Sequence, residues 1–194
     1  MVSWRALYVS FAGLLALERV GELVLSRRNA RRAFANGAFE VGQREYRAMA
    51  IFHVAFLAVC FAQIALFPHA HATLLGELAL AGALGAQALR YWAITTLGER
   101  WNTRVIVLPT APAVVGGPYR WIRHPNYVAV CMEMICVPLI YRGAAAYGLI
   151  VALLFTIGNA LILRQRIRTE EAALGPAYAR AFAATPRFIP GGIA

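Results

Sequence analysis

The sequence predicts an all-α protein, an integral membrane helical bundle of about five transmembrane helices, and three observations support this. First, 60% of the 194 residues are hydrophobic and 14% are charged, whereas about a quarter of the residues in a soluble domain are charged. Second, five apolar segments have roughly the 20 residues that a helix needs to cross a bilayer. Third, arginine is concentrated in alternate connections between these segments.

The five expected spans cover residues 4–25, 48–67, 74–97, 125–141 and 144–163. Glu18, Arg19 and Glu22 interrupt the first, and no clear cleavage site follows it, so an uncleaved span fits better than a signal peptide. The fourth span is short, and only Arg142 and Gly143 separate it from the fifth. We therefore expect these two spans to form a tight antiparallel hairpin.

The arginines also predict the orientation of the bundle. The connections 26–47 and 98–124 and the tail 164–194 are rich in Arg, whereas the short connections between spans two and three and between spans four and five are nearly neutral. Because basic connections stay on the cytoplasmic side, we expect the N-terminus outside and the C-terminus in the cytoplasm. The net charge of +10 then indicates membrane lipids as partners rather than nucleic acid.

No internal repeat or soluble domain interrupts the chain, so we expect one membrane domain, 1–194. Residues 1–100 would hold the first three spans and a basic loop, and 101–194 a second loop, the hairpin and a cytoplasmic helix. All basic residues are Arg and all acidic ones Glu, which indicates a GC-rich bacterial genome and, with the orientation above, a bacterial inner membrane protein with its chemistry on the cytoplasmic face.

The stretch "GPYRWIRHPNYVAV" (117–130) places basic and aromatic side chains at the start of the fourth span. Pro125 suits the first position of a helix, where its missing N–H costs nothing. The positive end of the helix dipole would then lie beside Arg123 and His124, an environment that favours a carboxylate or phosphate. Tyr119 and Tyr127 add aromatic faces for an adenine ring or a sulfonium cation. The alternative is a simple aromatic–basic belt at the membrane interface.

A second polar stretch, "RQRIRTEEAALGPAY" (164–178), leaves the inner end of the fifth span. Arg166 and Glu170 are four residues apart, so on a continuing helix they share one face. Gly175 and Pro176 should end that helix. The alternative is a solvated helix whose surface ion pairs each contribute less than about 1 kcal/mol.

Charged residues within the spans form a third set of candidates: Glu18, Arg19, Glu22, Arg90 and Glu133. Charges at membrane depth are costly, so they are expected to face protein or a water-filled cavity. Glu18 and Glu22 lie one turn apart and either pair with Arg90 or Arg19 or line a pocket.

The sequence lacks the motifs of several common classes of site. His53 is interpreted as a hydrogen-bonded packing residue, and no set of residues has the spacing of a metal site. Walker, HExxH, GxSxG and strand-borne GxGxxG motifs are absent from the sequence, which argues against P-loop, zincin, hydrolase and Rossmann folds.

In their order and spacing, "GPYRWIRHPNY", a helical hairpin and "RIRTEEAALGPAYARAF" resemble the isoprenylcysteine carboxyl methyltransferase family over about residues 101–190. The resemblance implies a membrane enzyme that uses S-adenosylmethionine. Ala129 stands where the family usually has glycine. By match of position, the resemblance assigns Arg166 to the acceptor and these residues to the cofactor: Arg104, Val114 (in the segment 111–114), Tyr119, His124, Pro125, Asn126, Tyr127 and Glu170.

The resemblance leaves the methyl acceptor open. A lipophilic or prenylated carboxylate would need an orienting cation, for which Arg166 is suited. A lipid phenol, with a pKa near 10, would need a base such as Glu18, Glu22 or Glu133. Alternatives are N-methylation of a phospholipid or amine, a nicotinamide-dependent membrane reductase, and a scaffold or transporter without enzymatic activity. No sequence feature sets an oligomeric state.

Overall fold

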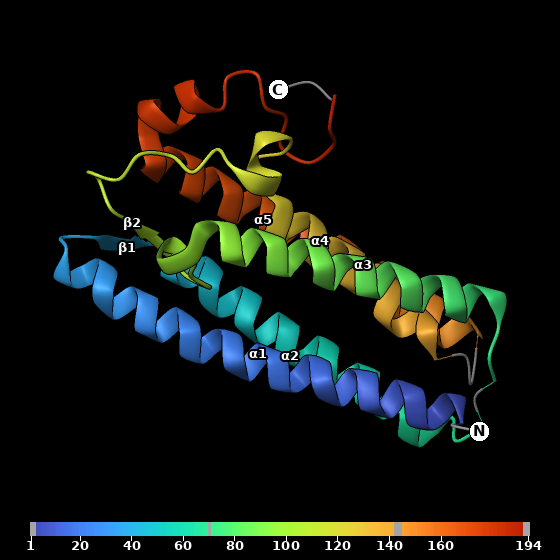
Figure 1. The fold of residues 1–194 in the computed structure, drawn as a ribbon. Coiled ribbons are helices and arrows are strands. Elements are labelled where there is room, and N and C mark those ends of the chain that lie inside the picture. Colours follow the sequence, from blue (N-terminus) through green and yellow to red (C-terminus); the bar gives the residue numbers. More distant parts are fainter. Residues whose placement is uncertain (1–2, 70, 142–144, 192–194) are drawn as a thin grey trace.

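In a computed structural model, which describes residues 3–69, 71–141 and 145–191, the chain is predominantly helical, as predicted, and also contains two short strands (Figure 1). The Arg142–Gly143 connection of the expected hairpin lies outside the described residues. The elements are α1 (Trp4–Ala35), β1 (Phe39–Val41), α2 (Gln43–Leu66), α3 (Leu74–Leu97), the 3₁₀ helix η1 (Gly98–Arg100), β2 (Val105–Val107), the 3₁₀ helix η2 (Gly117–Arg120), α4 (Pro125–Ile140) and α5 (Ala145–Ala181).

Two of the described helices, α2 and α5, are long and apolar enough to cross a membrane by length and composition, and α4 is a shorter apolar helix. Large apolar side chains are exposed on the outside of the bundle, which is the pattern of helices that face lipid rather than water. They lie on α1, α2, α3 and α5 and include Leu14, Leu17, Val20, Ile51, Val54, Leu78, Leu84, Leu153 and Leu161.

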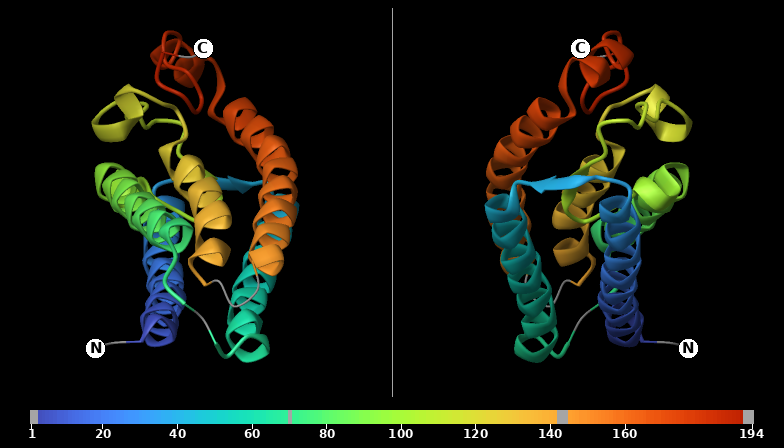
Figure 2. Two further views of the ribbon diagram at one scale, coloured as in Figure 1. Left: turned by 90° about the vertical axis from the view of Figure 1, so that its right-hand side faces the viewer. Right: turned by 90° about the vertical axis from the view of Figure 1, so that its left-hand side faces the viewer.

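Helix α4 packs between α3 and α5 (Figure 2). Two glycines allow close helix packing. A Cβ on Gly82 would come within 2.8 Å of the Cys136 sulfur, and one on Gly158 within 2.7 Å of the Phe52 ring. Small residues have this function in membrane bundles, because association there depends on close packing rather than on hydrophobic burial.

Two helices extend well beyond their expected spans. α1 continues to Ala35, so the first part of the connection predicted over 26–47 is helical rather than a loop. α5 continues past the expected span to Ala181, and Gly175 breaks it with a φ of 71° just before Pro176. This break confirms the prediction that these two residues end the helix. Glycine stands there because only glycine adopts such a φ without strain.

The sequence analysis predicted no strand, but β1 and β2 pair antiparallel with Phe39 opposite Val107. Each strand has three residues, which is too short for an alternating pattern to be read. The pairing joins the connection after α1 to the connection after α3. As a result β1, β2, η2 and the end of α5 lie at one end of the bundle, opposite the N-terminal end (Figure 2).

Candidate active site

A cavity of about 800 Å³ lies at the end of the bundle where the Arg-rich segments meet. This volume is within the range of small-molecule sites. Its wall includes residues from α1, α2, α3, α4 and α5 and from the segment 101–114. One part is polar and aromatic. The other part is apolar, extends between α1 and α2, and is lined by Leu23, Ala50, Val54 and Leu57.

The segment Arg123–Tyr127 is held in place by the C-terminal segment. Pro125 is the first residue of α4, as predicted, and His124 precedes it as the N-cap. The backbone N–H of Arg123 donates to Pro186 O at 2.9 Å, and that of His124 donates to Arg187 O at 3.2 Å. These backbone donors are therefore satisfied by protein.

The His124 ring is fixed by two contacts. It stacks on Tyr127, with ring centroids 5.2 Å apart, and its Nε2 lies 3.1 Å from a carboxylate oxygen of Glu171. Arg187 donates to both oxygens of that carboxylate, at 3.0 and 2.7 Å. Glu171 lies beyond the apolar part of α5, and hydrogen bonds from His124 and Arg187 lower its pKa to about 2. Because an ionised carboxylate only accepts, Nε2 is the donor.

Arg166, Tyr127 and Glu170 form a connected polar chain in the cavity wall. Arg166 Nε donates to the Tyr127 hydroxyl at 2.9 Å, and that hydroxyl donates to Glu170 at 2.5 Å. Arg166 Nη2 donates to Thr103 O at 2.6 Å. These contacts confirm that Arg166 and Glu170 share one helix face.

One nitrogen of Arg166 is left over. The residue is 4% exposed, and Nη1 is buried without a hydrogen-bond partner in the part of the chain that the structure describes. An unpaired donor on a buried cation is costly. Since Arg166 lines the cavity, a negatively charged or carbonyl oxygen of a ligand there would satisfy it.

Aromatic side chains form one part of the cavity wall. Tyr119 and Phe182 are buried together, with Ala113 and Tyr178 packed against them, and the Tyr178 and Phe182 rings lie 4.7 Å apart. Burial and the nearby charge of Glu170 raise the pKa of Tyr119 above 10, so its hydroxyl stays protonated.

Phe182 was not among the predicted site residues, and Tyr178 appeared only as the last residue of the polar stretch 164–178. Their four-residue spacing in "AYARAF" was the available signal, because it places both rings on one helix face. The residues that pack against them, Tyr119 and Ala113, come from segments distant in the sequence.

Arg104 also borders the cavity, but its charge is neutralised by protein. It donates to Glu40 of β1 at 2.9 Å, and its guanidinium lies 5.7 Å from the Phe34 ring centroid. Val114 lines the same region. As expected from the apolar side chains of "APAV", this segment offers a ligand only backbone polar groups.

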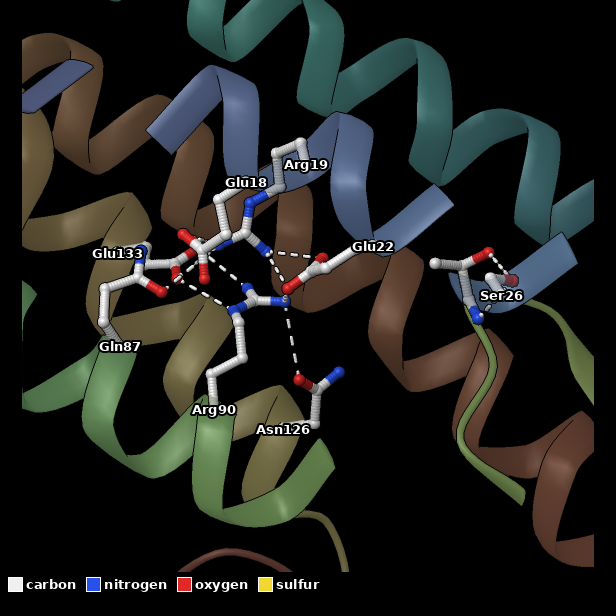
Figure 3. Close-up of polar contacts among 9 residues, drawn as sticks. Glu18, Arg19, Glu22, Ser26, Gln87, Arg90, Asn126 and Glu133 are labelled. Carbon is white, nitrogen blue, oxygen red and sulfur yellow. Dashed lines mark hydrogen bonds and ion pairs between the residues drawn. The ribbon is translucent and has the colours of Figure 1, made fainter. Parts of the chain in front are cut away.

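Five charged residues of α1, α3 and α4 form one cluster, which we call the charge cluster (Figure 3): Glu18, Arg19, Glu22, Arg90 and Glu133. Arg90 donates to both oxygens of Glu133, at 3.0 and 2.8 Å, and reaches Glu22 at 3.5 Å. Arg19 donates to both oxygens of Glu22, at 3.0 and 2.9 Å, and reaches Glu18 and Glu133 at 3.2 and 3.3 Å. These pairs join α1, α3 and α4.

The cluster resolves the two roles considered for Glu18 and Glu22. Both carboxylates pair with Arg19, and Glu22 also lines the cavity, with Arg19 and Arg90. Glu18 is not among the cavity-lining residues. Asn126, from the Arg-His-Pro-Asn-Tyr segment, accepts from Arg90 at 3.4 Å, so the cluster contacts the start of α4 directly.

His53 of α2 lines the cavity too. Its Nδ1 lies 2.8 Å from Met49 O, as a packing histidine would require. A carbonyl oxygen only accepts, so Nδ1 carries a proton, and in the neutral ring Nε2 keeps a free lone pair. Within the described residues Nε2 makes no hydrogen bond. His53 therefore offers the cavity a base that the sequence analysis did not anticipate.

The predicted site residues thus lie together, although no ligand defines their roles. All of them except Glu18, Pro125 and the candidate base Glu133 line this cavity: Glu22, Arg104, Val114, Tyr119, His124, Asn126, Tyr127, Arg166 and Glu170.

Comparison with known proteins gives concordant matches. The model of a family described as "Isoprenylcysteine carboxyl methyltransferase (ICMT) family" matches residues 78–176. The Bacillus subtilis protein named "Uncharacterized protein YpbQ" is 36% identical over 162 residues, which are 83% of this chain and 92% of that protein. A Haemophilus influenzae protein, also named "Uncharacterized protein", is 29% identical over 167 residues, 86% of this chain and 93% of that protein.

Proposed function

The chain belongs to the isoprenylcysteine carboxyl methyltransferase family, and from that premise we propose that it transfers the methyl group of S-adenosylmethionine to an oxygen of a lipophilic acceptor. Family membership and the apolar helices indicate a membrane methyltransferase. We further propose which cofactor the enzyme uses, which class of acceptor it methylates and on which face of the membrane its active site lies.

The proposed topology has five membrane helices, the N-terminus outside and the C-terminus in the cytoplasm of a bacterium. The Arg-rich connections after α1 and α3 and the Arg-rich tail lie at one end of the bundle (Figure 2). That end holds the polar part of the cavity. Because basic segments stay in the cytoplasm, we place the active site at the cytoplasmic face of the inner membrane.

The residues of the polar part fit S-adenosylmethionine. The aromatic faces of Tyr119 and Tyr178 suit an adenine ring or a sulfonium cation. Glu170 accepts from Tyr127 through one carboxylate oxygen, which leaves acceptor capacity for an amino or ribose hydroxyl group. When bound, this cofactor supplies a methyl group already activated on a positively charged sulfur.

One observation carries the assignment of the acceptor end: Arg166 lines the cavity, and its Nη1 has no hydrogen-bond partner among the described residues. Tyr127 and Thr103 fix the guanidinium through its other nitrogens. A preorganised, permanently charged donor orients a carboxylate oxygen without any proton transfer, because a carboxylate is already ionised at neutral pH.

The apolar part of the cavity fits the lipid portion of the acceptor. Val54 and Leu23 line the cavity and are 68% and 40% exposed. An apolar wall of this kind suits a lipid chain, because it loses no hydrogen bonds when it meets hydrocarbon. We infer that the acceptor enters sideways from the membrane, whereas the cofactor enters from the cytoplasm.

A hydroxyl acceptor such as a lipid phenol is the second candidate, and the free Nε2 of His53 favours it. Methylation of a hydroxyl oxygen releases a proton, and His53 lines the cavity as a neutral base with the required lone pair. The predicted bases Glu22 and Glu133 are instead held in ion pairs with Arg19 and Arg90.

The test has two stages. Calorimetry on detergent-purified protein should show saturable binding of S-adenosylmethionine and S-adenosylhomocysteine, and none of a nicotinamide nucleotide. Transfer of a labelled methyl group should then be measured to N-acetyl-S-farnesylcysteine, a long-chain alkylphenol and phosphatidylethanolamine. A His53→Phe variant that loses transfer only to the phenol would assign the base.

Two results would contradict the proposal. Folded protein that binds neither adenosyl compound would refute the cofactor and return the chain to a scaffold or transporter. Transfer to phosphatidylethanolamine alone would replace O-methylation with N-methylation.

A further inference from the structure

The final turns of α1 carry three exposed arginines: Arg27, Arg28 and Arg31. They continue a stripe of exposed apolar residues, Leu17, Val20 and Val24. At about 100° per residue, all six side chains fall within an arc of about 100° around the helix. We call the three arginines the α1 basic stripe.

The α1 basic stripe lies at the depth of lipid headgroups. α1 has 32 residues, which is about 48 Å of helix, and a bilayer core is about 30 Å thick. When the apolar part of α1 lies in hydrocarbon, its last turns must therefore leave it. Arg27 is only about 4.5 Å further along the helix than Val24.

These arginines have no protein partner in the described part of the chain. Arg27, Arg28 and Arg31 form no ion pair or side-chain hydrogen bond there, whereas the neighbouring Arg32 pairs with Glu99. Together with Val24 and Arg32, they border a surface hollow of about 360 Å³. Adjacent unpaired guanidinium groups are suited to bind a phosphate through two or more hydrogen bonds.

We propose that the α1 basic stripe binds the phosphate of an anionic phospholipid, whose acyl chains lie along Leu17, Val20 and Val24. Charge complementarity selects the anionic headgroup, because the stripe has three unneutralised positive charges. Continuity with the apolar stripe selects a lipid rather than a free phosphate. The proposal requires only that the protein resides in a membrane, so it does not depend on the methyltransferase activity.

The opposite face of the same turns holds the wall of the cavity. Ser26 donates to Asn102 at 2.6 Å, and Asn29 donates to Trp101 O at 2.8 Å. The next residue, Thr103, donates its backbone N–H to Ser26 and accepts from Arg166. A lipid that restrains this end of α1 would therefore also restrain the segment 101–103.

The experiment compares lipid binding by three proteins in detergent micelles. Native mass spectrometry measures binding of dioleoylphosphatidylglycerol and, as the uncharged reference, dioleoylphosphatidylcholine. The variant is Arg27→Gln/Arg28→Gln/Arg31→Gln. The matched control, Arg44→Gln/Arg168→Gln/Arg180→Gln, removes the same charge from exposed arginines dispersed over α2 and α5.

We expect the stripe variant to bind phosphatidylglycerol at least tenfold more weakly, since each basic contact at an anionic surface contributes roughly fivefold. The dispersed control should change binding by less than about threefold. In the wild type, phosphatidylglycerol should also slow hydrogen exchange of residues 98–104, and this protection should be absent in the stripe variant.

Equal loss of phosphatidylglycerol in both variants would overturn the proposal, because it would show only a general charge effect. Unchanged binding by the stripe variant would overturn it as well. A photoactivatable phosphatidylglycerol tests the wild type without any substitution, and labelling should fall on residues 17–31. Labelling that avoids this segment would place the lipid elsewhere.

Discussion

Replacement of Arg166 by Gln should impair turnover of a carboxylate acceptor much more than it impairs cofactor binding. Arg166 contacts Tyr127 and Thr103, and its remaining nitrogen, Nη1, has no hydrogen-bond partner in the part of the chain that the structure describes. The acceptor contact is therefore the part of the guanidinium that protein does not use. A hydrogen bond to a charged group contributes about 1.5–3 kcal/mol. At about 1.4 kcal/mol per factor of ten, kcat/KM should fall between about 10-fold and about 150-fold.

The assay is labelled-methyl transfer to N-acetyl-S-farnesylcysteine at saturating S-adenosylmethionine, with cofactor affinity measured separately by calorimetry. Arg166→Lys keeps the charge but not the forked geometry, so its loss should be intermediate. Arg168→Gln, an exposed change on the same helix, is the control and should retain wild-type turnover.

Wild-type kcat/KM in Arg166→Gln would refute the role of Nη1. A loss confined to cofactor affinity would equally refute it, because Arg166 would then belong to the cofactor end of the cavity.

Three further predictions concern the other polar contacts. Glu170→Gln should weaken S-adenosylmethionine binding by about tenfold, the effect of one charge-assisted hydrogen bond, as measured by calorimetry. Glu133→Gln should destabilise the protein by about 3 kcal/mol, because it leaves buried positive charge uncompensated, and its thermal midpoint in detergent should fall. The pKa of Glu171 is about 2 when folded and 4.5 ordinarily, so its stabilisation is present above pH 4.5 and is lost as pH falls towards 2. The gap in thermal midpoint between wild type and Arg187→Gln should therefore narrow below pH 4.5.

Each of these predictions has a clear contradiction. Equal cofactor affinity in Glu170→Gln would remove Glu170 from the cofactor site. A thermal midpoint for Glu133→Gln no lower than that of Glu77→Gln, an exposed change in the first turn of α3, would show that the charge cluster is not stabilising. If the difference in thermal midpoint between wild type and Arg187→Gln instead grew as the pH fell, the ionised Glu171 carboxylate would not be the stabilising form.

The helices were predictable because their signals are local. A membrane-type helix is indicated by an apolar run of about 20 consecutive residues. Its ends are indicated by single residues, such as the Pro at the first position of α4 and the Gly-Pro pair at the break in α5. The spacing of Arg166 and Glu170 likewise placed them on one face, and the structure confirms it.

Contacts between distant segments were not predictable in the same way. The β1–β2 pair joins strands of three residues each, so neither shows an alternating pattern. Tyr127 links Arg166 to Glu170, and Arg187 joins His124 at Glu171, through contacts that no spacing specifies. The role of His53 was not predictable either. It depends on the hydrogen bond of Nδ1 to Met49 O and on the position of the cavity beside α2.

The sequence by itself determined that this protein is a helical bundle of membrane type, which segments gather its arginines and which residues are candidates for chemistry. Hydropathy, helix termini and charge distribution are properties of neighbouring residues, so they can be read without a fold. Only the tertiary structure decided that Glu18 and Glu22 are paired by Arg19 and Arg90, and that Arg166 keeps one donor free. Whether a buried charge is neutralised or available to a ligand depends on groups that other helices bring within about 3 Å of it, and that distance is set by packing.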